Sequence, residues 1–128
     1  MAKSTGKRQA RLVRALRKAG LGAVAEYPIH SGAQIAQRLD VALPDRKLAI
    51  ECDGALHGKP AFGFRNSFRR QELDVLKREW LERNGWRVIL FRGDIAKASA
   101  SKIEEVVRLA LAAELRPGVP VLVWGEHG

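Results

Sequence analysis

The segment from Arg38 to Asp53 restricts the fold most, because it holds two alternating runs of apolar and polar residues around a short turn. Residues 38–43 alternate, Pro44-Asp45-Arg46 is typical of a turn, and residues 47–53 alternate again. A period of two is the pattern of β-strands, whose successive side chains point to opposite faces. The segment therefore predicts a β-hairpin near the centre of the chain.

Three acidic residues occupy polar positions of this hairpin. Glu51 and Asp53 are two residues apart and share one face of their strand, while Leu48, Ile50 and Cys52 face the core. Asp40 faces away from its apolar neighbours in the preceding strand. If the two strands pair, the three carboxylates converge on one face of the sheet. Because carboxylates held together repel each other, Lys or Arg side chains or a divalent cation must compensate them.

Carboxylate oxygens are ligands that suit Mg²⁺ or Mn²⁺. We therefore predict Asp40, Glu51 and Asp53 as metal ligands and catalytic residues. The alternative is that they are solvated side chains paired with arginines. His57, three residues after Gly54, is a candidate general base, metal ligand or phosphate contact, or else a surface residue.

The remaining elements follow from helical periodicity, capping signals and glycine or proline breaks. Before the hairpin we predict a basic amphipathic helix at 4–19, then an apolar run at 22–27 followed by Pro28 and a loop at Ser31-Gly32. After the hairpin we predict a helix at 67–84 and a strand at 87–92. A last helix runs from the capping box Ser101–Glu104 to about 116, and an edge strand follows at 119–124. This order predicts one α/β domain over residues 1–128, with a mixed four- to five-stranded sheet flanked by helices.

Charge points to the class of partner. The chain has 128 residues, with 23 Lys and Arg against 14 Asp and Glu, which gives a net charge of +9. Such a surplus favours phosphate-bearing partners, because their neutralisation releases counterions; an anionic membrane surface is the alternative. No apolar run approaches the length of a membrane span, the basic N-terminus lacks the apolar stretch typical of a signal peptide, and Cys52 is the single cysteine. We expect a cytoplasmic protein.

The stretch from Arg38 to His57 resembles the very short patch repair (Vsr)-like branch of the PD-(D/E)XK nuclease superfamily, which reads D-F-x-x-P-x-x-x-L-x-I-E-x-D-G-x-x-H. A second segment, Asp74-x-x-Lys77-x-x-x-Leu81-x-x-x-Gly85-Trp86-x-Val88, is similar to the branch's D-x-x-R-x-x-x-L-x-x-x-G-W-x-V. The resemblance covers roughly residues 26 to 92. Homing endonucleases with an EDxHD signature share the arrangement.

The resemblance implies a restriction-endonuclease-like core and Mg²⁺-dependent hydrolysis of DNA. It implies that Asp40 is the principal metal ligand and Glu51 the second acidic position, with Asp53 and His57 as additional active-site groups. Asp53 occupies the position of the lysine in the superfamily's E-x-K motif, so His57 or Lys59 is a candidate to replace that lysine. Gln9 lies near the place where many relatives carry a glutamate in the first helix.

Basic residues around the acidic segment are candidates for gripping phosphates, which positions DNA without reading its sequence. The alternative is that they form solvated helix faces. The candidates are Lys7, Arg11, Arg14 and Lys18 in the first helix, Lys59 in the loop after His57, and Arg65, Arg69, Arg70 and Lys77 before the fourth strand.

The function predicted from the sequence is that of a magnesium-dependent DNA endonuclease, in DNA repair or homing. Three alternatives stay open: a structure-selective junction resolvase of the same fold, a DNA-binding module without catalytic activity, and a protein–protein adaptor. A homodimer is the form expected for cutting both strands.

Overall fold

A computed structural model describes residues 3–32, 35–53, 64–92 and 98–124, and within these ranges the side chains of residues 3–8, 53, 64–68, 92 and 124 are left aside. The described residues form three α-helices and a five-stranded mixed sheet, so the fold class is α/β, as the sequence predicts. In chain order the elements are α1 (Lys3–Lys18), β1 (Val24–Ser31), β2 (Ile35–Leu43), the 3₁₀ turn η1 (Pro44–Arg46), β3 (Leu48–Asp53), α2 (Phe64–Arg83), β4 (Arg87–Arg92), α3 (Ala100–Ala112) and β5 (Pro120–Trp124).

The strands lie in the order β1-β2-β3-β4-β5. The first three strands pair antiparallel, and β3, β4 and β5 run parallel. The predicted hairpin around Pro44 is present as β2, η1 and β3, and β4 has the predicted bounds. No described helix has the length and apolar character that crossing a membrane requires.

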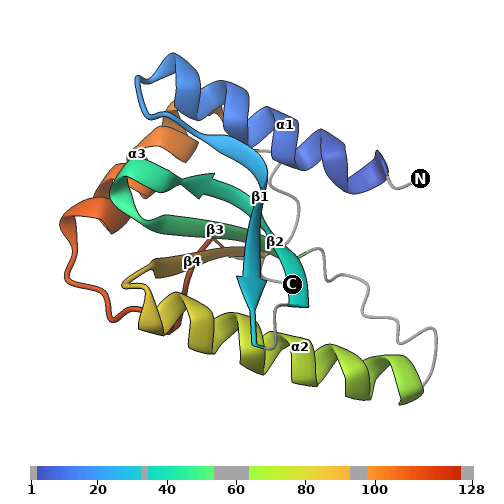
Figure 1. Ribbon diagram of the computed structural model, residues 1–128. Helices are drawn as coiled ribbons and strands as arrows, with labels where there is room; N and C mark the ends of the chain where they lie inside the picture. The colour runs from blue at the N-terminus through green and yellow to red at the C-terminus, as the bar shows by residue number, and fades with distance from the viewer. Residues whose placement is uncertain (1–2, 33–34, 54–63, 93–97, 125–128) are drawn as a thin grey trace.

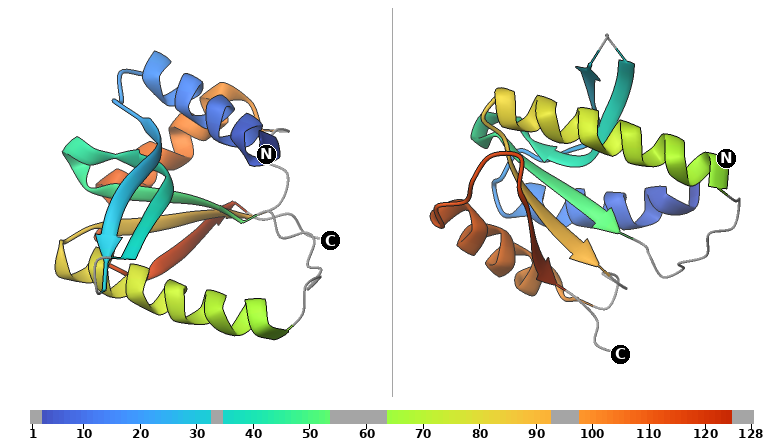
Figure 2. Two further views of the ribbon diagram at one scale, coloured as in Figure 1. Left: turned by 45° about the vertical axis from the view of Figure 1, so that its right-hand side comes forward. Right: turned by 90° about the horizontal axis from the view of Figure 1, so that it is seen from below.

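The sheet lies between two helical layers: α1 and α3 cover one face, and α2 covers the other (Figures 1 and 2). Each helix contributes an apolar stripe to the face that it covers, so the core has two parts. The α1–α3 side buries residues that include Leu12, Leu16, Ile50, Phe91, Ile103 and Val107. The α2 side buries Leu39, Ala42, Ala49, Leu81, Trp86 and Val88, among others.

Strand β3 is covered on both faces, whereas its alternation predicts one apolar and one polar face. Leu48, Ala49 and Ile50 are all 0% exposed, because Ala49 packs toward α2 while its two neighbours pack toward α1 and α3. The polar face of the hairpin therefore lies under a helix. Glu51 follows Ala49 by two residues, so it belongs to this covered face of β3.

Strand β1 is longer than the apolar run predicted at 22–27. It continues through Pro28, which lies opposite Arg38 of β2. An edge strand tolerates proline, because one side of its backbone has no strand to bind. The loop predicted at Ser31-Gly32 is the connection from β1 to β2.

Two helix boundaries also differ from those predicted. The N-cap of α3 is Ser99 rather than Ser101, since the Ser99 Oγ accepts a hydrogen bond from the Lys102 N–H at 3.1 Å. The same helix ends at Ala112 instead of 116, and Leu115 packs against the α1–α3 core beyond it. Helix α2 begins at Phe64, three residues earlier than the apolar periodicity predicts.

Gly118 is the glycine whose replacement should be most harmful among those described. It has a φ of +79°, and an added Cβ would lie 2.7 Å from the Glu82 Cβ. Gly85 has a similar φ of +75° but no atom within 4 Å of an added Cβ. We expect Gly118→Ala to lower the free energy of unfolding by about 2–4 kcal/mol and Gly85→Ala by about 1 kcal/mol. Urea unfolding measures both, and equal losses would contradict the close packing of Gly118 on α2.

Candidate active site

Asp40 and Glu51 meet where β2 and β3 stop pairing. The ladder between these strands runs from Leu43↔Leu48 to Val41↔Ile50. Beyond it, the Asp40 Oδ2 accepts a hydrogen bond from the Cys52 backbone N–H at 2.8 Å. The Glu51 Oε2 accepts one from the Asp40 backbone N–H at 3.4 Å. Each carboxylate therefore bonds to the backbone of the other strand, and the structure brings these two predicted residues together.

Both helical layers add a polar side chain to this acidic pair, Asp40 and Glu51. From α1, the Gln9 Nε2 donates to the Asp40 Oδ1 at 3.4 Å, and the Gln9 residue is only 6% exposed. From α2, the Lys77 Nζ lies 3.5 Å from the Glu51 Oε1. The acidic pair is thus approached from opposite faces of the sheet by one amide and one ammonium group.

The surroundings of the acidic pair disfavour the ionised form of Glu51 beside a charged Asp40. Burial of Glu51 and the nearby charge of Asp40 raise the pKa of the Glu51 carboxyl to about 7, against an ordinary value of 4.5. Lys77 and the hydrogen bond from the Asp40 backbone act in the opposite direction and only reduce the rise. Oxygen ligands in these surroundings fit a divalent cation, which would favour the ionised form of Glu51.

The position of Lys77 depends on the way α2 is fixed to the β1–β2 hairpin. The Gln37 Nε2 donates to the Leu73 carbonyl oxygen at 3.1 Å and to the Ser31 Oγ at 2.7 Å. The Leu76 side chain packs against Gly32, where an added Cβ would lie 2.7 Å from the Leu76 Cδ2. These contacts hold α2 at Leu73, one turn before Lys77, and at Leu76, the residue next to it.

Of the other predicted catalytic residues, Asp53 is described only in its backbone, and His57 is not described. Asp53 ends β3, where its backbone pairs with Arg92 of β4, but its side chain is outside the described set. His57 and Lys59 fall in the range 54–63, outside the described residues, as do the side chains of Lys7 and Arg65. The roles predicted for these residues stay predictions.

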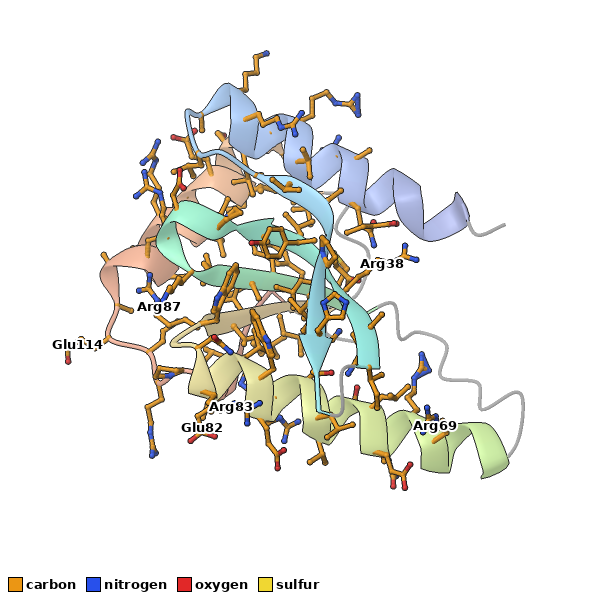
Figure 3. The ribbon with its side chains drawn as sticks, viewed as in Figure 1. Arg38, Arg69, Glu82, Arg83, Arg87 and Glu114 are labelled. Carbon is orange, nitrogen blue, oxygen red and sulfur yellow. The ribbon has the colours of Figure 1, made fainter. Side chains whose placement is uncertain are left out.

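The predicted phosphate contacts occupy different surroundings. Arg14 and Lys18 are exposed and line an open groove between α1 and β1, and Arg69 and Arg70 are exposed on α2. Arg69 lies at the opposite end of α2 from Glu82 and Arg83 (Figure 3). Arg11 is only partly exposed, and its Nη2 donates to the Ala98 carbonyl oxygen just before α3. The Arg11 guanidinium therefore joins α1 to the segment that leads into α3.

Two contacts of the acidic pair were not predicted from the sequence, those of Gln9 and Lys77. For Lys77, the sequence does contain a signal that its side chain faces inward. It lies four residues after Leu73 and four before the buried Leu81, so it shares the inward-facing stripe of α2. A lysine on such a stripe needs an acceptor, because burying an ammonium group without a partner is costly.

Comparisons with family models, with curated proteins and with solved structures found no match. Within the described residues, no group of three or more His, Cys, Asp or Glu side chains is placed to hold a metal ion. The acidic pair supplies two carboxylates of the predicted three, and the third belongs to Asp53, whose side chain lies outside that search. The argument for a function therefore depends on the acidic pair and its surroundings.

Proposed function

We propose that the protein is a metal-dependent DNA endonuclease whose reaction centre is the acidic pair, Asp40 and Glu51. The observation that carries the proposal is the meeting of two carboxylates at the end of a strand ladder, with the pKa of Glu51 raised to about 7. Carboxylates at functional sites commonly have pKa values that are perturbed in this way. The net charge of +9 favours a polyanionic substrate around this acidic centre.

The order α1-β1-β2-β3-α2-β4 supports the restriction-endonuclease-like core that the resemblance implies, since it puts the two motif acids on adjacent strands. Asp40 and Glu51, with Asp53 as the proposed third ligand, would hold Mg²⁺ or Mn²⁺. A bound divalent cation would supply positive charge for the phosphate and for the oxygen that leaves. Gln9 and the Cys52 N–H keep the Asp40 carboxylate in position by donating to its two oxygens.

DNA binding should depend strongly on salt, because the exposed cations of α2 would neutralise phosphates. We expect the double variant Arg69→Gln, Arg70→Gln to weaken DNA binding and to reduce the slope of log affinity against log salt by about 1 to 2. Fluorescence anisotropy in Ca²⁺ measures both quantities. Arg83→Gln, at the other end of α2, is the matched control and should leave the slope unchanged. A flat salt dependence for the unaltered protein would contradict phosphate binding altogether.

The nuclease proposal is tested by incubating supercoiled, linear and branched DNA with the protein in Mg²⁺, in Mn²⁺ and in EDTA. We expect cleavage in the presence of either metal and none in EDTA. Asp40→Ala and Glu51→Ala are assayed beside the unaltered protein. Cleavage that persists in both variants would show that another site or a contaminant is responsible.

The same assay separates the related functions. Preferential cleavage of branched DNA would identify a junction resolvase, for which two copies of the chain would be needed to cut opposite strands symmetrically. Binding without any cleavage by the unaltered protein would identify a DNA-binding module. The endonuclease is the function we favour, because a binding module gains nothing from holding two mutually repelling carboxylates close to each other.

A further inference from the structure

Lys77 differs in its surroundings from the other basic residues of α2 whose side chains the structure describes. Its side chain is 19% exposed, and that of its partner Glu51 is 22% exposed. By contrast, the side chain of Arg69 is 61% exposed, and its ion pair is with Glu72 of the same helix. A residue that only grips the DNA backbone is best placed in solvent, as Arg69 is. Lys77 is instead held inward, at the proposed reaction centre.

Strand β3 offers no lysine at this centre, since the position two residues after Glu51 is Asp53. The ammonium group that the described residues place at the acidic pair is that of Lys77, on α2. Gln37 and Gly32 contact this helix and fix it to the β1–β2 hairpin. An ammonium group has three N–H donors, and Glu51 accepts one from Lys77. Within the described residues Glu51 is the acceptor of Lys77, which leaves donors for an oxygen of a phosphodiester bound at the acidic pair.

We propose that Lys77 is a catalytic residue, whose ammonium group contacts the scissile phosphate and stabilises its transition state in place of a lysine on β3. This role depends on the proposed nuclease function. In the hydrolysis, a water oxygen forms a bond to phosphorus, and the bond from phosphorus to one sugar oxygen breaks. The water gives up a proton and the departing oxygen gains one, both by exchange with solvent. Lys77 keeps its own protons and acts through its charge.

The role is tested with Lys77→Met, which retains the length of the side chain without its charge, and Lys77→Arg, which retains the charge. We expect Lys77→Met to lower the single-turnover cleavage rate at saturating DNA by about 10²- to 10³-fold, with DNA affinity changed less than about threefold. Lys77→Arg should recover part of the rate. Arg83→Gln is the control, and thermal melting followed by circular dichroism shows that each variant is folded.

A second measurement separates a direct role of Lys77 from one exerted through Glu51. Mn²⁺ affinity, followed by isothermal titration without DNA, should stay equal or increase in Lys77→Met, because a positive charge beside the carboxylates is removed. Weaker Mn²⁺ binding would overturn the proposal, as would a full cleavage rate in a folded Lys77→Met. If the unaltered protein does not cleave DNA, both the nuclease function and the role of Lys77 fail. If it cleaves and Lys77→Met cleaves equally fast, only the role of Lys77 fails.

Discussion

Asp40→Asn is expected to lower the rate of metal-dependent DNA cleavage by about 10³-fold while the protein remains folded. Asparagine retains a side-chain oxygen that can accept the hydrogen bond from the Cys52 N–H, so the end of the β2–β3 ladder is preserved. The negative charge is lost, and with it the attraction for a divalent cation. A loss of about 4 kcal/mol of transition-state stabilisation corresponds to this change in rate.

Single-turnover kinetics at saturating DNA measure the effect of Asp40→Asn, with circular dichroism as the test of folding. Asp45→Asn is the matched control, because Asp45 is an exposed acid in the η1 turn of the same hairpin. The control should cleave like the unaltered protein. A folded Asp40→Asn variant that cleaves at the original rate would rule out Asp40 as part of the reaction centre.

Glu51→Gln is expected to stabilise the metal-free protein at high pH and to have little effect at low pH. The pKa of Glu51 is about 7 in the folded protein and 4.5 ordinarily, so folding favours the protonated carboxyl. The unaltered protein therefore loses stability as the pH rises from about 4.5 to about 7, where the folded protein must ionise Glu51. The difference from 4.5 to about 7 corresponds to up to about 3 kcal/mol at pH 8.

Urea unfolding in EDTA at pH 4.5 and pH 8 measures this difference. Glutamine stays neutral, so the gap between the variant and the unaltered protein should be near zero at pH 4.5 and largest at pH 8. Glu79→Gln, an exposed position of α2, should show no such trend. Mn²⁺ at pH 8 should stabilise the unaltered protein more than Glu51→Gln, since a ligand that binds only the folded state raises its stability. An identical gap at both pH values would contradict the burial of an ionisable Glu51.

Strand β3 was predictable because its alternation determines the face to which each side chain points. Strand β2 does not alternate as predicted, because Leu39 packs on the α2 side whereas Val41 and Leu43 pack on the α1–α3 side. A period of two puts residues 51 and 53 on one face of β3, and the short segment around Pro44 favours a hairpin. The hairpin accounts for the proximity of Asp40 and Glu51, whereas the contact of Asp40 with Gln9 of α1 does not follow from alternation. Gly85 likewise marks the end of α2 and the approach to β4, because a positive φ is needed there.

The surroundings of the acidic pair were not predictable in the same way. Alternation in β3 indicates a polar face, yet α2 covers that face, and this burial is the main reason that the pKa of Glu51 rises. Which helix covers which face is decided by tertiary packing, such as the contact of Gln37 with Leu73. For the same reason, the sequence predicts Lys77 as a phosphate contact but does not predict that its ammonium group lies 3.5 Å from the Glu51 carboxylate.

The layer formed by α1 and α3 has a consequence for synthesis of the protein. Arg11 donates to the carbonyl oxygen of Ala98, 87 positions later, and Arg108 donates to that of Ala19, 89 positions earlier. Leu12 and Leu16 are fully buried in the same core as Ile103 and Val107. Contacts between such distant segments form late, since the intervening chain must first be made and ordered. A nascent chain still lacking α3 would leave α1, and with it Gln9, without the contacts of α3, so the surroundings of the acidic pair should be complete only after residue 112 has left the ribosome.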